Sequence, residues 1–389
     1  MSISRRQFIL GGVPAIGASV LPFTTGGQAR PVAAVRPTGG HLAIQQFQDL
    51  ERLIPQLMRD GVVPGVSIAV IRNARVAWHR EFGVRDTVSQ ARVDEGTAFQ
   101  AASVSKTVFA YAVMQLRDRG ILGLDTPLTT YTTDRILAGD PRLDLITARH
   151  VLSHTSGLPN FRSRAEPLRI HFTPGEKYQY SGEGYWYLQS VVTHLTGTTD
   201  TRTCGSYEAD LNVCATDIDR YLAAHVLTPC QMGSSSFGWS AQLASNAARP
   251  HDAAGKALDV GKTSASNAAR YAAMGGLHTT AIDYAHFLIE IMAPRASKTF
   301  RLSEASRRDM CRPQVKVNGS HSWALGWEVH HTPQGDLIQH QGGQRGVQAF
   351  TAASVERASG YVILTNSDNG SKIFYDDRFT DAMNPLLFG

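Results

Sequence analysis

Residues 101–120 read AASVSKTVFAYAVMQLRDRG, and this stretch decides the fold. From Val104 to Arg119 it would be apolar on nearly every face of a helix, and Gly120 marks its end. A helix that lacks a polar face belongs inside a protein core. The stretch therefore predicts a buried helix that carries a serine and a lysine at its start.

Ser103 and Lys106 are the candidate catalytic pair at the start of this helix. They lie three residues apart, so one helical turn would place the lysine amine beside the serine hydroxyl. A serine becomes nucleophilic when a base removes its proton, and a lysine in a dry site has a lowered pKa and can accept that proton. The helix N-terminus would help to stabilise the resulting oxyanion. The alternative is an exposed lysine in the first turn, which conflicts with so apolar a helix.

The sequence on either side of this helix has the pattern of a mixed fold. Residues 41–60 have the spacing of an amphipathic helix, and the runs GVSIAVI and VAWHREFG predict a β-hairpin over 65–83. Helices are expected at 282–292 and from 371 onward. Further strand-like runs occur late in the chain: WALGWEV (323–329), DLIQH (336–340), VQAFTAAS (347–354) and YVILTN (361–366).

The middle of the chain, residues 126–265, is rich in Thr, Pro and Gly and predicts loops and short helices. Strands from both ends could pair in one sheet. We therefore expect an α+β fold with an antiparallel sheet flanked by helices, formed by residues 41–125 and 266–389. Residues 126–265 would be a mostly helical inserted domain, with the catalytic site in the cleft between the two regions.

Composition limits the function classes. With 42% hydrophobic and 18% charged residues among 389, the chain is globular rather than disordered. The net charge of +5 is spread along the chain, which argues against nucleic-acid binding. The histidines and cysteines lack metal-ligand spacing, and the chain has no P-loop and no G-x-S-x-G. We expect neither a metal nor an organic cofactor.

The first 29 residues predict an export signal. Arg5 and Arg6 precede a weakly polar run of 14 residues, Phe8 to Leu21, which is too short to span a bilayer, and Gly27-Gln28-Ala29 offers a cleavage site. The arginine pair is typical of a twin-arginine signal, and an ordinary secretory signal is the alternative. We expect export to the periplasm and no membrane span in the mature form.

Cys204 and Cys214 flank a polar stretch, TCGSYEADLNVC. An oxidising compartment would permit a disulfide between them, and two unpaired cysteines are the alternative.

Several further motifs follow the S-V-S-K stretch in a fixed order. They are LSHTSGLP (Leu152–Pro159), a P-G-x-x-x-x-Y-S stretch (Pro174–Ser181), GGLHTTAID (Gly275–Asp283), LGW (Leu325–Trp327) and H-x-G (His340–Gly342). Together they resemble the serine β-lactamases and penicillin-recognising DD-peptidases, and within them the class C β-lactamase-like branch. That branch includes esterases and D-amino-acid peptidases and amidases. The resemblance covers roughly residues 45–389.

The resemblance implies roles for particular residues. Ser103 would be the nucleophile and Lys106 its partner, and Tyr180 would exchange protons with the serine and the leaving group. A tyrosine has an unperturbed pKa of about 10, so it needs a neighbouring cation to act as a base, which Lys106 could supply. The backbone N–H groups of Gly343 and Ser103 would form the oxyanion hole. The His154 stretch is mostly structural in this family.

The strand that carries His340 and Gly342 would form one wall of the substrate site, and two departures from the family bear on it. Lactamase-type members often have lysine where this chain has His340, and they tend to have asparagine where it has Gly182. Both weaken the case for penicillin hydrolysis and favour an esterase or a peptidase. Arg345 could restore a positive charge near His340, or it could be a solvated loop residue. Residues 197–215 could reshape substrate access or form a passive loop.

We therefore expect a serine hydrolase that forms an acyl-enzyme on an ester, a lactam, or a D-amino-acid amide or peptide. Its partner would be this small-molecule or peptide substrate. The alternative is a penicillin or muropeptide sensor that is acylated without efficient turnover.

Overall fold

The computed structural model describes residues 39–132, 135–137, 139–162, 166–197, 211–259, 269–294 and 301–389. The predicted signal peptide, Cys204, the side chain of Cys214 and most of the 197–215 segment lie outside these residues. Everything below concerns the unit His41–Gly389. Among the described residues, no helix combines the length and apolar character needed to cross a membrane.

A nine-stranded sheet forms the centre of the described structure, and every neighbouring pair of its strands is antiparallel. Strands from the two ends of the chain meet where Val66 pairs with Thr365 and Ile71 with Gly360. The predicted antiparallel sheet is therefore confirmed. Its order is β3 (Ala91–Arg92), β2 (Arg75–Asp86), β1 (Gly65–Arg72), β11 (Ser359–Thr365), β10 (Val347–Ser354), β9 (Gly335–Gln344), β8 (Glu328–Thr332), β7 (His321–Trp323) and β6 (Val315–Lys316).

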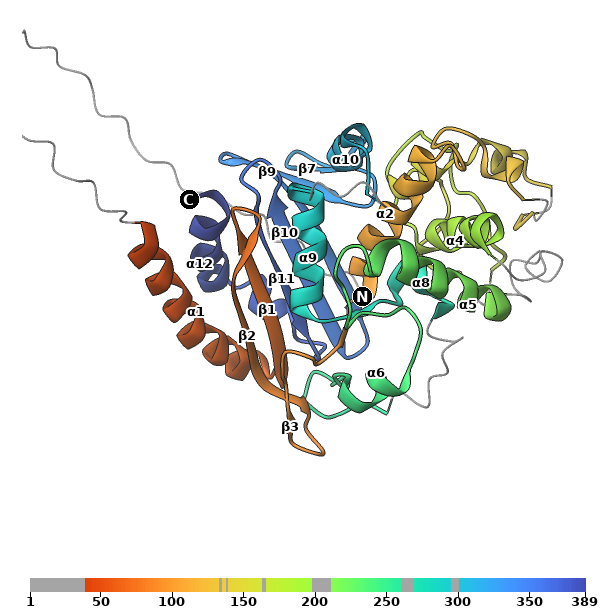
Figure 1. Cartoon of the computed structure of the whole chain (residues 1–389). Helices are drawn as coiled ribbons and strands as arrows, with labels where there is room; N and C mark the ends of the chain where they lie inside the picture. Colours follow the sequence, from red (N-terminus) through yellow and green to blue (C-terminus); the bar gives the residue numbers. More distant parts are fainter. Residues whose placement is uncertain are drawn as a thin grey trace, which may run out of the picture. The chain divides into compact units, whose positions relative to one another are not determined.

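Helices cover both faces of this sheet, as Figure 1 shows. Val66, Ile68 and Val70 of β1 pack with helices α1 (Gly39–Gly61) and α12 (Asp377–Phe388). The alternate residues Ala69 and Ile71 belong to the cluster that holds α9 (Ala281–Met292). Because successive side chains of a strand point to opposite faces and both faces of β1 are covered, β1 is apolar apart from Ser67 and the terminal Arg72.

Helix α2 (Ser105–Asp118) is the predicted core helix, and every residue from Ser105 to Leu116 is buried. The strand β4 (Phe99–Gln100) lies just before α2 in the chain and pairs antiparallel with the distant β5 (His278–Thr279) in a separate two-stranded sheet. The other α-helices of the described residues are α3 (Ala148–Leu152), α4 (Gly182–Thr196), α5 (Leu211–Leu222), α6 (Ala241–Asn246), α8 (Ala272–Gly275), α10 (Glu304–Cys311) and α11 (Ser371–Phe374). The described part of 126–265 has helices and loops and no strand of either sheet, and its domain boundaries stay a prediction.

One predicted strand is wrong. The run 323–329 contains the end of β7, a tight turn and the start of β8, with Ala324 N–H donating to Trp327 O at 2.7 Å. Gly326 makes this turn at φ 89°, in the left-handed region. A Cβ at Gly326 would lie 2.5 Å from Cβ of Ala110 in α2, so the turn needs glycine to pack on the core helix. The apolar run 323–329 therefore resembles a strand in sequence, but its packing against α2 requires a turn.

Gly326→Ala should therefore destabilise the protein by about 2–4 kcal/mol, because it adds both left-handed strain and overpacking. Gly120→Ala is the matched control. Gly120 also has a positive φ, 68°, but no atom lies within 4 Å of the position that a Cβ would take. It should cost roughly 1 kcal/mol. Urea unfolding at constant m-value measures both. Equal losses would show that contact with Ala110 adds nothing.

Candidate active site

Ser103 lies in a single 3-10 turn, Ala102–Val104, directly before α2. Within residues 101–116, all of them described, Ser103 is the one residue that is not buried. Ala102 has φ 45°, a strained conformation for a residue with a Cβ. Ser105 braces the turn: its Oγ donates to Ala102 O at 2.6 Å and accepts the Leu277 N–H at 3.0 Å. The turn thus holds one hydroxyl at the surface of an otherwise closed helix.

The Lys106 amine lies directly beneath this hydroxyl. Its Nζ is 3.1 Å from Ser103 Oγ and donates to Met274 O at 2.7 Å, while the residue is 1% exposed. Removal from water disfavours the charged ammonium and lowers the pKa of Lys106 to about 7. A neutral amine can therefore be present at physiological pH, next to a serine.

Tyr180 completes the group. A hydrogen bond joins its phenol to Ser103, and Lys106 Nζ lies 5.2 Å from the centre of its ring. Burial raises the pKa of the Tyr180 phenol, and the hydrogen bond to Ser103 only partly opposes this. The structure therefore brings together the three residues predicted for catalysis, with the phenol protonated at neutral pH.

His340 lies in β9 and is 2% exposed. Its Nδ1 is hydrogen-bonded to the neighbouring Gln341 O at 2.8 Å, and its ring packs 5.5 Å from the ring of Trp323. Burial, together with the nearby Lys106, lowers the pKa of His340 to about 3. His340 is therefore uncharged at neutral pH, rather than partly charged as its ordinary pKa would suggest, and its contact with substrate stays a prediction.

The next residues of β9 run against the Ser103 turn. A Cβ at Gly342 would lie 2.3 Å from Ala101 O and 3.2 Å from Ser103 N, so glycine is required for this approach. Gly343 follows, exposed and paired with Gln348 of β10. This places the backbone of β9 beside the Ser103 N–H, while the pairing of Gly343 and Ser103 in an oxyanion hole stays a prediction. Arg345 is exposed in the turn after β9, and no contact recorded among the described residues joins it to His340.

Asn160 is a site residue that the sequence analysis missed. The Gly182 N–H donates to both Asn160 O and Asn160 Oδ1 at 3.1 Å. A Cβ at Gly182 would lie 2.5 Å from Asn160 O and 2.8 Å from Met274 Cε. The backbone of Asn160 therefore excludes a side chain at 182, and the Asn160 carboxamide lies there instead. The available signal was its position directly after LSHTSGLP.

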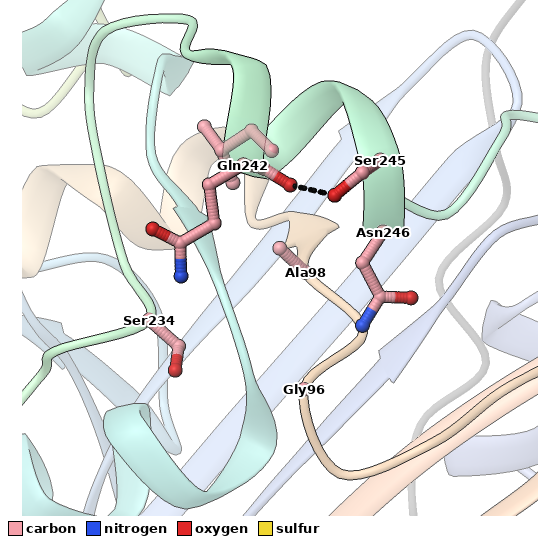
Figure 2. A pocket seen from close by; sticks show the side chains of 7 residues that line it. Gly96, Ala98, Ser234, Gln242, Ser245 and Asn246 are labelled. Atoms are coloured by element: carbon pink, nitrogen blue, oxygen red, sulfur yellow. Dashed lines mark hydrogen bonds between the residues drawn. The ribbon is translucent and has the colours of Figure 1, made fainter.

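A pocket lies between α6 and the segment before β4 (Figure 2). Its polar groups bond within the protein: Ser245 Oγ donates to Gln242 O at 2.8 Å, and Asn246 Nδ2 donates to Asp94 at 2.9 Å. It contains none of the residues predicted for catalysis or substrate binding.

The sequence model of the Beta-lactamase family matches residues 50–382, the part of the chain that contains all of these motifs. This chain belongs to the beta-lactamase family. The resemblance inferred from the motifs is thereby confirmed, together with the β-lactamase/transpeptidase-like fold.

Individual members of the beta-lactamase family are distant from this chain. Protein flp of Staphylococcus aureus (strain MW2) is 21% identical over 341 residues, which cover 82% of this chain and 63% of that protein. The chain thus spans less than two thirds of this curated relative's length.

Two solved structures share the fold. A class C beta-lactamase superposes with a TM-score of 0.71 at 19% identity, covering 88% of this chain and 96% of its own. The D-alanine carboxypeptidase AmpC of Burkholderia cenocepacia superposes with a TM-score of 0.71 at 17% identity, covering 89% and 99%. At these identities the likeness establishes the fold.

The buried Lys106 predicts a pH-dependent stability. Between pH 7 and about 10 the unfolded chain binds a proton at Lys106 that the folded chain does not, so folding becomes more favourable as pH rises. Lys106→Met lacks this proton. It should be more stable than the wild type at pH 7, with an advantage that shrinks by up to about 1.4 kcal/mol per pH unit toward pH 9.

Urea unfolding at pH 7, 8 and 9 measures this difference. Lys372→Met is the control, because the Lys372 side chain is exposed before and after unfolding. A constant gap between the wild type and Lys106→Met would show that Lys106 keeps its proton on folding.

Proposed function

We propose that the protein is a serine hydrolase that acts through an acyl-enzyme on Ser103. The observation that carries this proposal is the 3.1 Å hydrogen bond between Ser103 Oγ and an amine whose pKa burial lowers to about 7. A base with that pKa is matched to neutral pH, where it can take the serine proton without being permanently charged. Ser103 is half-buried, whereas its neighbours are buried, so a substrate has access to the pair.

During acylation Lys106 gains a proton and Tyr180 loses one. Ser103 Oγ attacks the carbonyl carbon while its proton passes to Lys106 Nζ, and the N–H groups of Ser103 and Gly343 hold the oxyanion. When the intermediate collapses, the bond to the leaving group breaks and Tyr180 gives that group its proton. Lys106 is then an ammonium and Tyr180 a phenolate. Burial raises the pKa of the Tyr180 phenol, so Tyr180 is protonated at neutral pH and cannot take the serine proton. Lys106, whose pKa burial lowers to about 7, is therefore the base, and the phenol holds the proton that the leaving group receives.

Deacylation returns both protons. Water gives one proton to the Tyr180 phenolate and attacks the acyl carbon, and the Ser103 oxygen leaves with the proton of Lys106. The free acid departs and all three side chains regain their starting states. Water and the three residues account for every atom, and no cofactor enters the scheme.

An ester, or a D-amino-acid amide or peptide with no carboxylate beside the scissile bond, fits this site better than a penicillin. The neutral His340 provides no cation for a substrate carboxylate. Asn160 offers a carboxamide beside Gly182, and its Oδ1 is already held by the Gly182 N–H. The Nδ2 group can then donate to a carbonyl on the acyl side of the substrate. Lactam hydrolysis would use the same chemistry with less help in binding.

Ser103→Ala should abolish both turnover of p-nitrophenyl esters and covalent labelling by a fluorophosphonate, because no nucleophile remains. Ser105→Ala is the matched control: it lies two residues away and makes only structural hydrogen bonds. It should keep its label and lose stability. Mass spectrometry locates the adduct, and an adduct elsewhere overturns the assignment. A burst of product without turnover would instead favour the sensor.

Asn160→Asp should discriminate between substrates. Aspartate keeps an oxygen to accept the Gly182 N–H but has no N–H to donate. For an N-acyl-D-alanyl ester, kcat/KM should fall about tenfold relative to p-nitrophenyl acetate, the effect of one lost hydrogen bond. The acetate ester lacks the acyl-side amide and reports any general effect of the new charge. Equal changes for both substrates would remove Asn160 from substrate recognition.

A further inference from the structure

His154 holds the backbone on both sides of Tyr180. The Gln179 N–H donates to His154 O at 2.8 Å, and the Ser181 N–H donates to His154 Nδ1 at 3.0 Å. The imidazole also lies against the phenol ring itself, with 4.1 Å between ring centres and 33° between planes. One residue therefore makes contact before, at and after Tyr180.

These contacts define the chemical state of His154. Because Nδ1 accepts a backbone N–H, it carries no proton, and the neutral ring must carry its hydrogen on Nε2. Nε2 is buried and has no hydrogen-bond partner within the described residues. The ring is surrounded by aromatic groups, with centres 4.7 Å away at Trp323 and 5.2 Å away at Tyr185. Burial, with Lys106 and His340 close by, lowers the pKa of His154 well below its ordinary value.

The backbone of His154 is strained. It has φ 56°, a left-handed conformation that few residues other than glycine and asparagine adopt, and its side chain is 0% exposed. Glycine would relieve the strain but could make neither the Nδ1 bond nor the ring contact. A strained residue persists where its surroundings determine it closely, and here those surroundings are the two neighbours and the ring of Tyr180.

We propose that His154 is a positioning residue that sets the Tyr180 phenol against Ser103, through its ring contact and its two backbone hydrogen bonds. The inference rests on the proposed function, in which Tyr180 protonates the leaving group. His154 itself touches neither substrate nor the serine. Its effect must therefore appear in the step that Tyr180 serves, which is kcat rather than substrate binding.

Three substitutions separate the contacts. His154→Phe keeps a ring against Tyr180 but leaves the Ser181 N–H without an acceptor. His154→Ala loses both. His154→Asn suits the left-handed backbone, and its Oδ1 stands as many bonds from Cα as Nδ1 does, so it keeps the acceptor. With a D-amino-acid amide, whose amine leaving group needs a proton, we expect kcat to fall about 10- to 100-fold in His154→Phe and His154→Ala, with KM within about twofold. His154→Asn should recover part of the loss.

His251→Phe is the matched control for the loss of a buried histidine. His251 is also 0% exposed and its Nε2 accepts a backbone N–H, that of Thr87 at 3.2 Å, but its ring contacts Asn366 rather than Tyr180. This variant should lose stability and keep its kcat.

A double-mutant cycle distinguishes positioning from general damage. In a Tyr180→Phe background, His154→Phe should cause little further loss, because there is no longer a phenol hydroxyl to position. Additive losses, or a wild-type kcat in His154→Phe while Tyr180→Phe is slow, would overturn the inference and leave the proposed function standing. Full activity of Tyr180→Phe would overturn both.

One measurement needs no variant. Nitrogen-15 NMR of the wild-type protein distinguishes the two tautomers and the charged ring. His154 should remain an Nε2–H tautomer from pH 5 to pH 8. A proton on Nδ1 anywhere in this range would be incompatible with the bond from Ser181 and would overturn the inference even if every His154 variant failed to fold.

Discussion

The burial of the Lys106 amine is the constraint on which the other features depend. A charged lysine cannot remain in so dry a place without strong compensation, and the compensation is small: one carbonyl, one hydroxyl, and the rings of Tyr180 and Tyr185 at 5.2 and 5.4 Å. The amine therefore gives up its proton near pH 7. Burying this amine in the apolar surroundings of α2 lowers the stability of the fold and also provides a base.

Close backbone approach is the second requirement, and glycines meet it at three places around α2. Gly342 lets β9 reach the Ser103 turn, Gly326 lets the β7–β8 turn reach Ala110, and Gly182 leaves room for Asn160. Each lies where a Cβ would meet another atom at 2.5 Å or less. The site is thus assembled by backbones in contact, which leaves its few polar side chains little freedom to rearrange.

Local pattern predicts the parts of this protein that depend on local sequence. The apolar stretch before Gly120 became α2, and GVSIAVI became the two-faced strand β1. The pattern failed where a distant contact decides the conformation. The turn at Gly326 exists because Ala110 lies against it, and Asn160 occupies the place of a side chain at 182. Likewise, the neutrality of His340 could not be predicted from the ordinary pKa of histidine. It depends on burial of the ring beside Trp323 and Lys106, which only the fold brings about.

Charge in this site is created by the proposed reaction rather than stored before it. At neutral pH, Tyr180 is protonated, His154 and His340 are uncharged, and Lys106, with its pKa lowered to about 7, exists in both its neutral and its charged form. Acylation would form an ammonium and a phenolate together, with Lys106 Nζ 5.2 Å from the centre of the Tyr180 ring, in surroundings where water screens their attraction weakly. That attraction favours the state in which the leaving group has received its proton. The neutrality of His154 and His340 supports the same state, because an imidazolium beside Lys106 would repel the Lys106 ammonium that forms during acylation.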